Sequence, residues 1–189
     1  MKLDYSKYDT DKNTFHSYMK TYEDLFSKYD NIPVSLLEIG VWGGGSMKMW
    51  KDFFAEGSLI HGVDLYPNQH NWPKYHENVK DSILYEGNAT TIQLKEKFDI
   101  IIDDGSHIFE DVLLAMKNLW WNLKAGGIYV VEDVTADGNS GWVHNEWNVQ
   151  MQSRLGLEYE LVNLLHERSD HTNSTLGPNN ILLVFRKED

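Results

Sequence analysis

The feature that most restricts the fold of this chain is a regular alternation of short apolar runs with segments of helical period. Apolar runs of strand length occupy residues 34–41, 58–65, 82–89, 98–104 and 127–134. Segments with one apolar face follow two of them, at residues 46–54 and 110–123, and Ser46 is expected to cap the first of these helices. Strands that alternate with helices are typical of a parallel sheet covered by helices on both faces.

The ends of the chain complete this pattern. A helix is expected over residues 15–29, ahead of the sheet, and a helix stop is expected at the glycines of "KAGG". Residues 135–148 have no clean period and are expected to form a loop, whereas 159–166 and 180–187 resemble a terminal antiparallel pair. We therefore predict an α/β fold, a Rossmann-like doubly wound three-layer sandwich with a seven-stranded, mostly parallel sheet.

Composition limits the classes of function. A chain of 189 residues with 41% hydrophobic residues is long enough to bury the core of one domain. Its formal net charge of -12 argues against nucleic acid as a partner, because phosphate backbones are also negative. The sequence has no cysteine, no apolar run of membrane-spanning length and a highly charged N-terminus. These features predict a cytoplasmic protein without a membrane partner.

A glycine-rich loop follows the first predicted strand. Its pattern, Gly40-Val-Trp-Gly43-Gly44-Gly45, is close to the G-x-G-x-x-G of dinucleotide-binding folds, where the backbone approaches a pyrophosphate. Glu38 is poorly suited to a diphosphate but suits the cationic groups of S-adenosylmethionine, and Asp64 at the end of the second strand suits its ribose hydroxyls. The alternative is an ordinary turn with a surface glutamate. We expect cofactor contacts from Glu38, Gly40, Gly43, Ser46 and Asp64.

Four segments of the chain together resemble a known family. They are "LLEIGVWGGGSMKMW", "HGVDLY", "FDIIIDDGSH" and "GGIYVVEDV". They are similar to class I S-adenosylmethionine-dependent methyltransferases and, more narrowly, to the metal-dependent macrolide-sugar and aminocoumarin-sugar O-methyltransferases. The N-terminal "YDTDKNTFHSYMKTYEDLF" also resembles a segment of that family. The resemblance covers residues 8–134 and fades across 135–177.

Acidic residues gather where the fourth and fifth strands are expected to end. Asp104, Glu132 and Asp133 would repel one another there unless a cation lay among them, and oxygen ligands suit Mg²⁺ first, with Mn²⁺ or Ca²⁺ as alternatives. The resemblance implies the same metal on the same acids. It also implies that His107 is the general base, and imidazole groups ordinarily titrate near neutrality, at about pH 6.5.

Several other residues are weaker candidates. Asp103 is expected either to cap the following helix or to contact the cofactor, and Asn88 lies where this fold usually contacts adenine. His16 and Tyr18 are interpreted as packing of an amphipathic helix, with closure over the cofactor as the alternative. Aromatic and histidine side chains of the loop after the fifth strand are candidates for the acceptor pocket or for local packing: Trp142, His144 and Trp147.

The sequence therefore predicts one methyltransferase domain over residues 1–189. Its parts are a helical cap (1–31), a cofactor-binding core (34–134), a substrate loop region (135–158) and terminal antiparallel strands (159–189). The predicted acceptor is a hydroxyl of a small molecule, a sugar or glycosylated metabolite. The alternatives are a nicotinamide-dependent oxidoreductase and a non-catalytic cofactor-binding protein. Aromatic residues such as Trp120 and Trp121 motivate a prediction of homo-oligomerisation.

Overall fold

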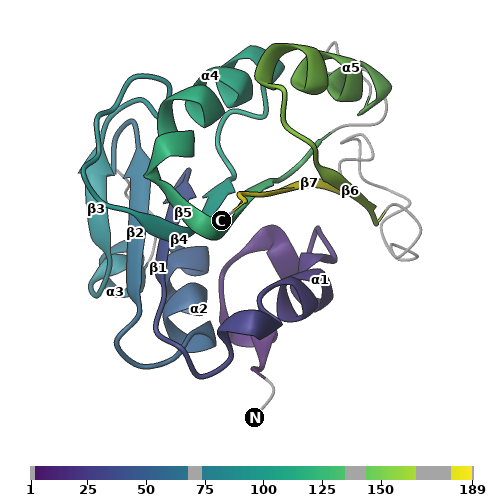
Figure 1. Cartoon of the computed structure of the whole chain (residues 1–189). Helices are drawn as coiled ribbons and strands as arrows, with labels where there is room; N and C mark the ends of the chain where they lie inside the picture. Colours follow the sequence, from purple (N-terminus) through teal and green to yellow (C-terminus); the bar gives the residue numbers. More distant parts are fainter. Residues whose placement is uncertain (1–2, 68–73, 135–143, 165–179, 189) are drawn as a thin grey trace.

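The fold is a central sheet with helices on both faces (Figure 1). The computed structural model describes residues 3–67, 74–134, 144–164 and 180–188. Its seven-stranded sheet has the order β3-β2-β1-β4-β5-β7-β6. No helix among the described residues is long and apolar enough to cross a membrane.

Five neighbouring strands are parallel, and of the last two only β7 runs in the opposite direction. The parallel strands are β1 (Ser35–Ile39), β2 (Leu59–Asp64), β3 (Ile83–Glu86), β4 (Phe98–Asp103) and β5 (Leu123–Val131). Strand β7 (Ile181–Arg186) is antiparallel to both β5 and β6 (Glu160–Asn163). The predicted doubly wound sheet is confirmed, including the pairing of β4 with β5 and the terminal antiparallel pair.

Each face of the sheet has its own apolar core. One core contains residues of α1 (Tyr18–Leu25), α2 (Gly45–Phe53) and α3 (Tyr75–Val79), and the other contains residues of α4 (Phe109–Leu119) and α5 (His144–Leu155). Four 3₁₀ helices complete the described elements: Tyr5–Lys7, Asp11–Asn13, Ser27–Tyr29 and Trp120–Asn122. From β1 the chain adds β2 and β3 on one side of the sheet and then β4 and β5 on the other. Ligands bind in open α/β sheets at such a switch point, here between the carboxyl ends of β1 and β4.

Three sequence predictions about these elements are wrong in detail. Residues 144–155 form α5 although 135–148 were expected to be a loop. Apolar positions are sparse there, but Met151 is completely buried in the core shared with α4. The helix expected over 15–29 is limited to α1, with a 3₁₀ turn after it. The "KAGG" glycines do not end α4 but lie within β5, where the pairing with β4 shifts register after Phe98.

Candidate active site at the carboxyl ends of the parallel strands

The ends of β1 and β4 approach closely because Gly40 has no side chain. Gly40 has a φ of +87°, and a Cβ atom there would collide with the backbone carbonyl oxygen of Asp104. The Asp104 amide donates to the Ile39 carbonyl at 3.0 Å, so the chain after β4 lies against the glycine loop. Glycine at this position therefore allows two strand ends to form one site.

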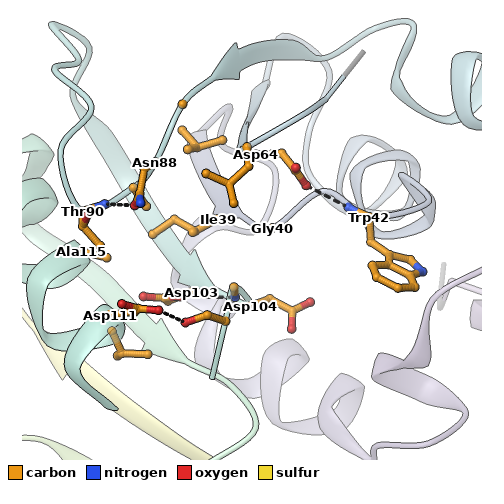
Figure 2. Close-up of a pocket in the computed structure, with 17 residues that line it drawn as sticks. Ile39, Gly40, Trp42, Asp64, Asn88, Thr90, Asp103, Asp104, Asp111 and Ala115 are labelled. Carbon is orange, nitrogen blue, oxygen red and sulfur yellow. Dashed lines mark hydrogen bonds between the residues drawn. The ribbon is translucent and has the colours of Figure 1, made fainter. Parts of the chain in front are cut away.

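A cavity of about 300 Å³ lies along the ends of β1, β2 and β4 (Figure 2). Apolar side chains such as Ile39, Val63 and Val112 form much of its wall. In Figure 2, Asp64 and Asn88 lie on one side and Asp103 on the other. An apolar slot with a few polar groups at its rim is the usual form of a small-molecule site.

The Asp64 carboxylate is fixed by backbone amides. One of its oxygens accepts from the amides of Val41 at 3.0 Å and Trp42 at 3.4 Å, and the other accepts from the amide of Tyr66 at 3.0 Å. These three backbone donors fix the orientation of the carboxylate at the end of β2.

Asp103 is nearly completely buried at the end of β4, with an exposed fraction of 3%. Its carboxylate accepts from the Tyr129 hydroxyl at 3.1 Å and from the Gly105 amide at 3.3 Å. Burial raises the pKa of Asp103 to about 7, although these hydrogen bonds act in the opposite direction. Asp103 lines the first cavity and does not make a side-chain cap for α4.

A second cavity, of about 680 Å³, adjoins the first. It lies between the N-terminal segment Tyr8–His16 and the glycine loop, and His107 and Asp133 form another part of its wall. The two cavities share residues of their walls: Gly40, Trp42, Asp104 and Gly105. Two molecules bound in these cavities would meet beside Asp104.

A group of side chains able to bind a cation lies at this junction. Asp104, His107 and Asp133 each offer a ligand atom, and these atoms lie within 4.8 Å of one another. His107 Nε2 is 3.9 Å from Asp104 Oδ1 and 3.8 Å from Asp133 Oδ2. Two carboxylates suit Mg²⁺, which usually keeps several water ligands, so these residues fit such an ion.

The N-terminal segment supports Asp133 from the opposite side. The Tyr18 hydroxyl donates to Asp133 Oδ1 at 2.6 Å, and His16 Nε2 lies 3.4 Å from the same atom. His16 also stacks on Tyr18 and contacts Asn180 through Nδ1 at 3.2 Å. Packing was the preferred interpretation of His16 and Tyr18, and both are indeed buried, but they also reach the acidic group directly.

A buried lysine of the same segment lies among three carboxylates. Lys12 is completely buried, and its Nζ atom is 2.6 Å from Asp104 Oδ2, 2.8 Å from Glu132 Oε2 and 3.2 Å from Glu38 Oε1. The other Glu132 oxygen accepts from the Tyr22 hydroxyl at 2.5 Å. Burial lowers the pKa of Lys12, but the three carboxylates raise it more, so its pKa lies well above the usual value. Burial raises the pKa of Glu38 and of Glu132, and the Lys12 ammonium opposes both shifts.

Comparison with known proteins identifies the family of this chain. Residues 37–134, about half of the chain, match the family model described as a methyltransferase domain. This chain belongs to that methyltransferase family.

Two relatives of this methyltransferase domain are O-methyltransferases by name. It is 34% identical over 170 residues to the 8-demethyl-8-alpha-L-rhamnosyl tetracenomycin-C 2'-O-methyltransferase of Streptomyces olivaceus, covering 85% of this chain and 44% of the relative. It is 38% identical over 138 residues to the demethylmacrocin O-methyltransferase of Streptomyces fradiae, covering 68% and 35%. The chain thus spans less than half the length of these relatives.

A solved structure is also similar. The MycE methyltransferase of the mycinamycin pathway, in complex with Mg and SAH, matches with a TM-score of 0.70 and 26% identity, over 100% of this chain and 54% of that one. The predicted resemblance to methyltransferases is therefore confirmed.

The methyltransferase domain places most of the predicted site residues on the cavity walls. The first cavity is lined by Gly40, Asp64, Asn88 and Asp103, and the second by Gly40, Gly43, Ser46, His107 and Asp133, with Asp104 on both. Two predicted residues do not line either cavity, because Glu38 and Glu132 are buried around Lys12. Their assignment to the cofactor and the metal remains a prediction.

The remaining predictions concern the cap of α2 and the aromatic and histidine residues after β5. Ser46 was expected to cap α2, but Gly44 in the left-handed conformation is the N-cap residue, and the Ser46 hydroxyl instead donates to Glu38 at 2.7 Å. Trp142 lies outside the described residues. His144 and Trp147 belong to α5, but their side chains lie outside the described part of the chain, so the predicted acceptor role of these residues stays untested.

Lys12, Tyr22 and Trp42 were not predicted as site residues. Lys12 stands in a run of polar and charged residues, "DTDKNT", which is typical of an exposed segment. Its only sequence signal was the resemblance of the N-terminal segment to the family, which did not indicate which residue is buried.

Proposed function

We propose that this chain is an S-adenosylmethionine-dependent, divalent-metal-assisted O-methyltransferase that methylates a hydroxyl of a small sugar-containing molecule. The observation that carries the proposal is the pair of adjoining cavities that meet beside Asp104. One cavity has the groups expected around an adenosine, and the other has a candidate base and cation ligands. A methyl donor and an acceptor bound there would be adjacent.

The first cavity suits the cofactor. The fixed Asp64 carboxylate would accept hydrogen bonds from the ribose hydroxyls, and the apolar wall would cover the adenine ring near Asn88. The similar MycE structure is a complex with SAH, the product form of this cofactor, which supports the assignment. Family membership removes the main ground for the nicotinamide-dependent alternative.

The second cavity suits the acceptor and its deprotonation. A bound Mg²⁺ supplies a positive charge that lowers the pKa of a nearby hydroxyl, and Asp104 and Asp133 are the residues that would hold it. His107, which lines this cavity, would take the hydroxyl proton at Nε2 as the oxygen attacks the methyl group in line with the departing sulfur. Glu132 was also predicted as a metal ligand, but Lys12 and Tyr22 already engage both of its oxygens.

A sugar is the acceptor class that the second cavity and the relatives favour. One relative is named for a rhamnosyl tetracenomycin, and MycE has been crystallised with mycinamycin VI, which together support a sugar hydroxyl as the target. Phe15 and Trp42 line the second cavity and are 51% and 70% exposed. Exposed aromatic faces are suited to pack against sugar rings.

Isothermal titration with S-adenosylhomocysteine tests the cofactor assignment. Wild-type protein is expected to bind it, and Asp64→Asn to bind roughly 10- to 150-fold more weakly, since hydrogen bonds to a charged group contribute about 1.5–3 kcal/mol. Glu86→Gln is the matched control, because Glu86 is the exposed neighbour of Asp64 at the end of β3. No binding by the wild type, or equal weakening in both variants, would contradict the assignment.

A further inference from the structure

The buried Lys12 has no role in the function proposed so far. It comes from the 3₁₀ helix Asp11–Asn13, yet its ammonium group reaches acids at the ends of three strands. Glu38 lies on β1, Asp104 follows β4, and Glu132 follows β5. The N-terminal segment thus supplies a cation to the centre of the sheet's carboxyl edge.

The contacts of these acids show that Lys12 is their main source of charge balance. Ser46 donates to one Glu38 oxygen, but the other makes no hydrogen bond within the described part of the chain and lies 3.2 Å from the ammonium. Carboxylates that gather around one ammonium group repel one another when that cation is removed, and a buried ion without a partner is destabilising by several kcal/mol.

The orientation of Asp104 also depends on Lys12. Asp104 Oδ2 accepts from the lysine at 2.6 Å, whereas Oδ1 lies on the side of His107. Gly45 allows the lysine-bearing segment to approach the glycine loop closely, because a Cβ atom there would collide with the backbone carbonyl of Asp9. Lys12 therefore fixes one oxygen of Asp104 by a hydrogen bond, and the other oxygen points toward His107 and Asp133.

We propose that Lys12 is a positioning residue, a built-in counter-cation that balances the buried acids and orients Asp104 so that its second oxygen can bind a divalent cation. The orienting role rests on the proposed function, whereas the charge-balancing role does not. A lysine that merely fills space would be replaceable by an apolar side chain of similar length.

The test compares Lys12→Met, Glu38→Gln and the double variant, with Lys20→Met as a control on an exposed lysine. Without metal, Lys12→Met is expected to melt about 10 °C below the wild type, as for a broken buried ion pair. The double variant loses one positive and one negative charge, so the net charge of this cluster equals that of the wild type. It is therefore expected to recover at least half of the melting temperature lost in Lys12→Met. Lys20→Met is expected to have the same melting temperature as the wild type.

The second measurement is Mn²⁺ affinity, followed by the electron paramagnetic resonance of the free ion. Glu38→Gln keeps Lys12 on Asp104 and is expected to bind Mn²⁺ within about threefold of the wild type. The double variant loses this anchor and is expected to bind about 10- to 100-fold more weakly, as when a residue that orients a metal ligand is removed. This difference is one that a purely structural lysine would not produce.

Specific outcomes overturn the proposal. A melting temperature of Lys12→Met equal to that of the wild type would rule out the charge-balancing role. Equal Mn²⁺ affinity in Glu38→Gln and the double variant would remove the orienting role, as would an equal loss in both. Failure of the double variant to fold, with or without Mn²⁺, would also contradict it. None of these measurements uses S-adenosylmethionine, so they are separable from failure of the proposed cofactor to bind.

Discussion

At the residue scale, three residues of the candidate site adopt a left-handed backbone conformation, with positive φ, that normally favours glycine. Trp42, His107 and Asp133 have φ values of +45°, +56° and +57°. Non-glycine residues in this region are strained, and they persist where the surrounding structure over-determines them, often at functional sites. All three line the second cavity, so the strain is located where the proposed acceptor binds.

Replacement of His107 tests the proposed base. His107→Ala is expected to reduce methyl transfer about 10²- to 10⁴-fold, the usual contribution of a positioned general base, and to leave the affinity for S-adenosylhomocysteine nearly unchanged. Transfer of labelled methyl groups to a panel of glycosylated polyketides would measure the first quantity, and calorimetry the second. His76→Ala, at an exposed position of α3, is the control. Full activity of His107→Ala would rule out this role.

Another histidine gives the fold a dependence on pH. His61 in β2 is 2% exposed, its Nε2 atom makes no hydrogen bond among the described residues, and burial lowers its pKa. The unfolded chain therefore binds a proton at His61 more readily than the folded chain does, so stability falls as the pH drops below about 6.5.

Urea unfolding at pH 7.5 and 5.5 checks this effect. The wild type is expected to lose more free energy of unfolding on acidification than His61→Gln, which cannot take up the proton. His76→Gln should retain the wild-type dependence because His76 is exposed. Parallel pH profiles for the wild type and His61→Gln would contradict the assignment.

At the element scale, buried parallel strands were the most predictable parts of the fold. Segments such as "FDIIIDD" are mostly apolar and end in polar residues, so both the strand and its polar end could be predicted. Helix α5 could not, because few of its residues are apolar and its position depends on packing against α4. The helix stop at "KAGG" failed because α4 already ends at Leu119, and the two glycines lie at the register shift between β4 and β5, where their backbone hydrogen-bonds with Lys187.

The close approach of β1 and β4 gives an element-scale prediction. Gly40→Ala and Gly57→Ala both place alanine at positive φ, which costs about 1–2 kcal/mol. Only Gly40→Ala also collides with a backbone carbonyl, whereas the nearest atoms to a Cβ at Gly57 lie 3.6 Å away on Pro33. Gly40→Ala is therefore expected to lose about 1–3 kcal/mol more free energy of unfolding, measured with urea. Equal losses would show that the contact between strand ends is not constrained.

At the scale of the whole molecule, the N-terminal segment forms part of the candidate active site rather than a cover beside it. Its residues line the second cavity, and Lys12, Tyr18 and Tyr22 contact the acids at the strand ends. The sequence predicted the acids themselves, because they follow strands. It could not predict their partners, because contacts between residues 12 and 132 arise only when the segment packs on the sheet.

The surface gives a prediction about assembly. Trp121 is 73% exposed, and Lys187 lies over the rings of Trp120 and Trp121 at 5.7 and 5.6 Å. The homo-oligomer predicted from these aromatics is expected to appear in sedimentation velocity as a mass above one chain, and Trp121→Ser is expected to shift it toward the monomer. Leu59→Ser, at another exposed apolar position, is the control. A single species of one-chain mass at high concentration would refute it.

The most direct test of the central claim is the anomalous diffraction of a crystal grown with S-adenosylhomocysteine and Mn²⁺. We predict that the adenosine lies in the first cavity with its ribose hydroxyls on Asp64. We also predict a manganese peak between Asp104 and Asp133, with Lys12 still on Asp104. Nucleoside density outside that cavity, or a manganese peak remote from these two acids, would contradict the account.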